Sequence, residues 1–96
     1  MAQAKTPKYN VVVDILNEKF EGSGKTIEEA LENVDISWKE IKGNGEITVS
    51  KGNNKFTHLF NRPSMVRIFS NKNTRMQQAK RFELLLPMSK ESNKPE

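Results

Sequence analysis

The residues from 46 to 60 constrain the fold more than any other part of this 96-residue chain. Glu46–Ser50 and Phe56–Phe60 each alternate between two kinds of side chain, and Lys51–Lys55, with Gly-Asn-Asn at its centre, separates them. Alternation on both sides of such a turn is typical of a β-hairpin. Pro63 follows closely, and proline cannot donate a hydrogen bond to a sheet. The sequence therefore predicts a hairpin that ends at about residue 60.

A second hairpin is predicted near the N-terminus. Tyr9–Leu16 is rich in β-branched residues, and its odd-numbered side chains would form one apolar face of a strand. Residues 17–19 allow a tight reversal, after which Phe20 and Glu21 pair back as a short strand. Gly22–Gly24 then interrupts the pattern, so we expect this short strand to end there.

Helices are predicted after each hairpin. Thr26–Glu29 has the Thr-x-x-Glu spacing of a capping box, and apolar residues recur at helical spacing from 27 to 34. Pro63 suits the first turn of a short helix over 63–69. Thr74–Gln77 resembles a second capping box, which opens a helix that runs to Leu86 and stops at Pro87. Residues 81–86 also fit a strand, which is the alternative to the end of that helix.

These elements predict the α+β class, as a small single domain. An antiparallel sheet built from two hairpins would be covered by two or three short helices. Residues 1–8 and 88–96 are polar and unpatterned, so we expect a flexible N-terminus and a flexible polar tail around a domain at 9–87. Cysteine is absent, and no stretch is apolar enough to span a membrane. We therefore expect a cytoplasmic protein without a membrane partner.

Charge is distributed very unevenly along the chain. Residues 1–50 carry six basic and nine acidic side chains, whereas residues 51–96 carry ten basic and three acidic ones. No acidic residue occurs between Glu46 and Glu83. The candidate binding residues are the basic side chains of that stretch: Lys51, Lys55, Arg62, Arg67, Lys72, Arg75, Lys80 and Arg81. A local positive field of this kind favours an anionic partner.

Three interpretations of the basic half remain open. The leading one is nucleic acid, either DNA or RNA, bound through its phosphates with little sequence preference. The others are an acidic protein surface and a face that merely keeps the domain soluble. A core this small supports only about 5 kcal/mol of stability, to which a homodimer or a bound partner would add.

Catalysis and cofactor binding are not expected. Gly22–Thr26 ends like a phosphate-binding P-loop, but that loop needs a further glycine where Lys19 stands. His58 has no partner nearby in the sequence that would orient it as a base or complete a metal site. Glu28, Glu29 and Glu32 fit the solvated face of a helix. We therefore predict a non-enzymatic protein with no catalytic residue, no metal and no cofactor.

The order of these segments resembles a group of small uncharacterised accessory proteins encoded by bacteriophages. The likeness rests on Tyr9–Val13, on the Gly-Lys-Thr-Ile-Glu-Glu-Ala-Leu passage at 24–31, on residues 42–51 and on the Phe-rich basic segment that follows. The resemblance implies a phage or mobile-element accessory protein in the cytoplasm of a bacterial host. It also implies the main alternative function, docking on and inhibiting a host protein or a bacterial defence complex. It assigns no binding residue.

Overall fold

One four-stranded antiparallel sheet organises the computed structural model, which describes residues 8–93. The elements along the chain are β1 (Tyr9–Ile15), β2 (Glu18–Gly24), α1 (Ile27–Glu32), a 3₁₀ turn η1 (Trp38–Glu40), β3 (Gly45–Lys51), β4 (Asn54–Phe60), α2 (Arg62–Ser70) and α3 (Lys72–Asn93). The strand order is β2-β1-β3-β4, and each neighbouring pair is antiparallel. This confirms the predicted α+β domain with two hairpins, and it shows that residues 81–86 are helical.

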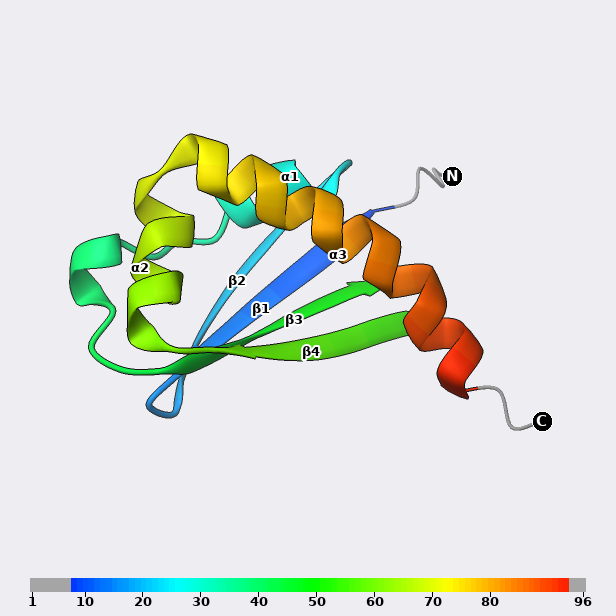
Figure 1. The fold of residues 1–96 in the computed structure, drawn as a ribbon, viewed down its shortest axis with the longest axis horizontal. Helices are drawn as coiled ribbons and strands as arrows, with labels where there is room; N and C mark the ends of the chain where they lie inside the picture. The colour runs from blue at the N-terminus through cyan, green and yellow to red at the C-terminus, as the bar shows by residue number, and fades with distance from the viewer. Residues whose placement is uncertain (1–7, 94–96) are drawn as a thin grey trace, which may run out of the picture.

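All three α-helices lie on the same side of the sheet (Figure 1). The core forms between them and the strands, because alternate residues of β1 and β3 point toward the helices. The buried apolar side chains are Val11, Val13, Ile15, Ile27, Ala30, Leu31, Val34, Ile41, Ile47, Val49, Met65, Ile68, Ala79, Phe82 and Leu86. Within residues 8–93, no helix covers the other face of the sheet, where most side chains are polar (Figure 1).

The β1–β2 hairpin is longer than the sequence predicted. Gly22 and Gly24 do not end β2; they lie within it and pair with Val11 and Tyr9 of β1. A Cβ atom on Gly22 would lie 2.5 Å from the carbonyl oxygen of Ala30. The glycine is therefore needed because the end of α1 packs directly against the backbone of β2, and the Asn33 side chain donates to the Ser23 carbonyl there (2.7 Å).

The β3–β4 hairpin is confirmed, with a tighter turn than predicted. Only Gly52 and Asn53 connect the strands, and Gly52 has a φ of 60°. A positive φ costs glycine little and other residues more, so this turn explains why glycine stands at this position.

Helix ends agree only in part with the predicted capping. The Thr26 hydroxyl accepts from the Glu29 amide (3.0 Å) as expected, and the Glu29 carboxylate accepts from the Lys25 amide (2.6 Å). The second predicted capping box is wrong, because α3 begins at Lys72, where the Asn71 side chain accepts from the Thr74 amide (3.0 Å).

The predicted end of the last helix at Pro87 is also wrong, because α3 continues to Asn93. A proline inside a helix removes one hydrogen bond, here the one to the carbonyl of Glu83, which lies on the exposed side of α3 where water can replace the lost donor. Residues 88–93 of the expected polar tail thus belong to α3. Residues 94–96 and residues 1–7 of the expected N-terminal segment lie outside the described residues.

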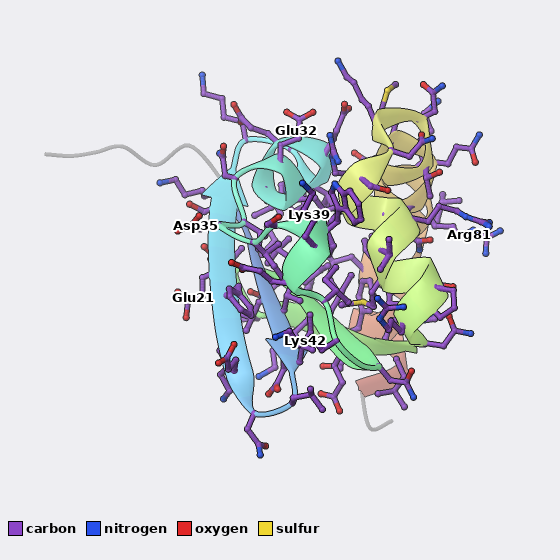
Figure 2. The ribbon with its side chains drawn as sticks, turned by 90° about the vertical axis from the view of Figure 1, so that its left-hand side faces the viewer. Glu21, Glu32, Asp35, Lys39, Lys42 and Arg81 are labelled. Atoms are coloured by element: carbon purple, nitrogen blue, oxygen red, sulfur yellow. The ribbon has the colours of Figure 1, made fainter. Side chains whose placement is uncertain are left out.

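The strand order converts the charge asymmetry of the sequence into an asymmetry in space. The acidic half forms β1, β2, α1 and nearly all of β3, whereas the basic half forms β4, α2 and α3. The two edge strands, β2 and β4, therefore belong to different halves, although α3 packs against α1 as well as β4. Figure 2 shows Glu21 and Asp35 on the β2 side of the molecule and Arg81 on the far side, on α3. Within residues 8–93, no helix has the length and hydrophobicity needed to cross a lipid bilayer.

Candidate nucleic-acid interface

Arg75 does not belong to the exposed basic surface, although the sequence grouped it there. Only 16% of its side chain is exposed, and its Nη1 donates to the Ile68 carbonyl of α2 (3.2 Å). Its Nη2 lies 3.9 Å from the Glu32 carboxylate of α1. Arg75 therefore connects three helices, and its charge is directed into the helical layer.

Two further predicted residues also make contacts within the domain. The Nε of Arg62 donates to the Ile41 carbonyl (2.9 Å), so this side chain holds the segment before β3 against the start of α2. The ammonium group of Lys51 lies 4.9 Å from the centre of the Tyr9 ring and 3.5 Å from its hydroxyl. Lys55 lies on the opposite face of the sheet from the helices, across from Ser50 of β3.

Four predicted residues point outward from the two C-terminal helices. Arg67 lies on α2, Lys72 begins α3, and Lys80 and Arg81 lie a little more than two turns further along α3; all four are exposed. We call these four residues the α2–α3 basic surface. Arg67 also lines a shallow depression of about 350 Å³ together with Arg62, Pro63, Val66 and Ser70. Glu83 is the exposed carboxylate on the part of α2 and α3 up to residue 86.

Aromatic rings of the basic half are used in packing and not as an exposed platform. Phe82 is fully buried, and its ring centre lies 5.3 Å from that of Phe56 and 6.1 Å from that of Phe60. Phe69 is half-buried against the same core. His58 is exposed on β4, where its ring stacks on Phe60 at 4.5 Å. Stacking of several bases on phenylalanines, which is how many proteins hold single strands, is therefore not available here.

Side-chain amides that could read base edges are also partly occupied. The Oδ1 atoms of Asn61 and Asn71 cap α2 and α3 by accepting from backbone amides at 3.0 Å. Asn73 and Gln77 are exposed on α3. The chemistry available on this surface is consequently neutralisation of phosphates by dispersed cations, with little capacity for base readout.

No arrangement of three or more metal-binding side chains occurs within residues 8–93.

Comparison with known proteins does not assign a function to the α2–α3 basic surface. The chain matches no protein-family model, and neither the curated proteins nor the solved structures include one with significant similarity to it. The geometry of the α2–α3 basic surface is therefore the basis on which a function is inferred.

We expect that Arg75→Ala lowers the free energy of unfolding by about 1–3 kcal/mol, because it removes a hydrogen bond and packing between helices. Glu32→Gln should cost less than about 1 kcal/mol, because the Glu32 side chain is 39% exposed and its ion pair is partly screened. Urea denaturation of both variants measures these differences. An Arg75→Ala protein that is as stable as the wild type would contradict the structural role.

Proposed function

We propose that the protein binds the phosphate backbone of nucleic acid through the α2–α3 basic surface, as an accessory protein of a phage or another mobile element. The observation that carries this proposal is the exposure of Arg67, Lys72, Lys80 and Arg81 on two adjoining helices. Most of the acidic residues in the first half of the chain lie on β1, β2 and α1, so an approaching polyanion is attracted to α2 and the exposed side of α3 and is repelled from the β2 edge. Lys80 is the member of this surface that lies nearest to acidic residues, since it lines a depression with Glu28 and Glu83.

Double-stranded nucleic acid fits this surface better than a single strand. Single-stranded binding normally combines cations with aromatic rings on which the bases stack. The phenylalanines near the surface pack around Phe82 instead. A duplex keeps its bases stacked internally and presents regularly spaced phosphates, which dispersed cations can neutralise without reading the sequence.

The experiment that tests this function is a fluorescence-anisotropy titration of a labelled duplex and the matching single strand at two salt concentrations. We expect the duplex to bind more tightly than the single strand, with little difference between unrelated sequences. A plot of log affinity against log salt concentration should fall with a slope of roughly −0.9 per phosphate contact. Arg67→Ala should make that slope shallower by roughly 0.9, the contribution of one phosphate contact. Lys19→Ala, which changes an exposed lysine on β2, is the matched control and should leave the slope unchanged.

Absence of binding to either oligonucleotide below about 100 µM at physiological salt would contradict the proposed function, since this is the weak end of ordinary non-specific affinity. A pull-down from bacterial lysate with and without nuclease then distinguishes the alternative. If one defined host protein is recovered with and without nuclease, docking on a host protein becomes the favoured function. Partners that disappear after nuclease treatment would support nucleic-acid binding.

A further inference from the structure

A groove on the sheet end near the β1–β2 turn is bordered by two exposed leucines. It has a volume of about 540 Å³, and its lining includes Asp14, Leu16, Glu46 and Leu59. Leu16 is 64% exposed and Leu59 is 70% exposed. Figure 1 shows this turn beside the start of β3 and the end of β4. Apolar side chains that line a concave surface are typical of an interaction site.

The turn that presents Leu16 is poorly suited to leucine. Leu16 and Asn17 have φ angles of 50° and 73°, and two-residue turns of this kind favour asparagine, aspartate or glycine at both positions. A leucine in the left-handed region costs about 1 kcal/mol or more. Asparagine or glycine at position 16 would make a more stable hairpin but would remove an apolar wall of the groove.

The same groove carries an excess of negative charge. Asp14 of β1 lies directly opposite Glu46 of β3, and like charges in this position are unfavourable. Lys19 on β2 lies opposite Asp14, but the other cross-strand neighbour of Glu46 is Leu59. Glu46 therefore lies next to Leu59, with about 5 Å between adjacent strands, and Asp14 lies one strand further away.

A complementary arrangement occurs on α3. Leu84 is 71% exposed, and it lies three and four residues after Arg81 and Lys80. Residues at these spacings are neighbours on a helix surface, with about 5–6 Å between their Cβ atoms. The helix thus presents one apolar side chain beside two cations, although Lys80 also lines a depression with Glu28 and Glu83. The groove presents the opposite charge beside Leu59, with Glu46 adjacent and Asp14 one strand further away.

We propose that the groove binds α3 of a second copy of this chain. Leu84 would be covered by Leu16 and Leu59, while Lys80 and Arg81 approach Asp14 and Glu46. The contact joins two different surfaces, so each copy retains one unused groove and one unused helix. Self-association is therefore head to tail and continues beyond a dimer unless the rotation between copies closes a ring.

Sedimentation equilibrium of the nuclease-treated protein tests this contact. The interface is small, so we expect the weight-average mass to rise with concentration over roughly 0.1–1 mM and to fall back at high salt. A groove variant, Asp14→Lys with Glu46→Lys, and a helix variant, Lys80→Glu with Arg81→Glu, should each remain monomeric. Their mixture should associate, because mixing restores opposite charges at both kinds of contact. The basic groove of the first variant meets the acidic helix of the second, and the unchanged groove of the second meets the unchanged helix of the first.

Leu84→Ser, with the wild-type charges kept, should weaken association at least tenfold. Lys25→Glu should not, since Lys25 neither lines the groove nor lies on α3. Circular dichroism of each variant checks that it is folded. A wild-type protein that is monomeric at 1 mM would overturn the proposal. So would association that survives both charge variants, or a mixture of them that stays monomeric.

Discussion

Replacing Gly22 by alanine is expected to lower the free energy of unfolding by about 2–3 kcal/mol, which is the upper range for an inserted methyl group. The new Cβ would lie 2.5–2.6 Å from backbone atoms of Ala30, Asn33 and Val34. Backbone atoms cannot move aside as a flexible side chain can, so α1 must shift away from β2. For a domain of this size the melting temperature should fall by roughly 10–20 °C.

Gly52→Ala is the matched control for this prediction. Gly52 has a φ of 60° and no atom within 4 Å of an added Cβ, so alanine there incurs the backbone cost alone, about 1 kcal/mol. Thermal unfolding followed by circular dichroism compares the two variants. Equal losses of stability would show that Gly22 is required for its backbone conformation and not for the close approach of α1.

The second prediction concerns the α2–α3 basic surface. Arg67→Glu combined with Lys72→Glu is expected to weaken duplex binding about 30-fold or more at physiological salt and to reduce the salt slope by about two contacts, or roughly 1.8 units. Both residues lie outside the proposed Leu84 contact, so this variant tests phosphate binding separately from self-association. The measurement is fluorescence anisotropy over a series of salt concentrations.

Lys19→Glu with Lys25→Glu provides the comparison with equal net charge. Each replacement changes the charge by two units, so both double variants go from a net charge of +4 to 0. Binding through the α2–α3 basic surface predicts a large loss in the first variant and a small one in the second. Similar losses in both would mean that overall charge, and not this surface, determines binding.

The fold was predictable where local patterns and tertiary packing agree. The Gly52–Asn53 turn lies between two alternating segments, and Thr26 begins α1 as its spacing indicates. The sequence misled at Gly22 and Pro87, because glycine and proline usually interrupt elements. Here α1 packs on the backbone of β2, and α3 continues past a proline on its way to Asn93. Single residues do not reveal such tertiary contacts.

The sequence predicted that the second half of the chain is basic, but it did not predict which of the basic side chains are exposed. Periodicity alone does not show that Arg75 turns inward to Ile68 and Glu32, or that Arg62 donates to Ile41. The contacts with Glu32 and Ile41 join residues far apart in the sequence. The groove beside Leu16 was missed for the same reason, since Asp14, Glu46 and Leu59 meet only once three strands have paired. The leucine in the turn at residue 16 was the available signal.

The separation of charge across the sheet has a consequence for what a coated duplex would look like from outside. When Arg67 and Lys72 face the phosphates, the β2 edge with Glu21 and the neighbouring carboxylates of α1 faces the solvent. The outer shell of the complex is then acidic, so the coated duplexes should repel one another instead of condensing.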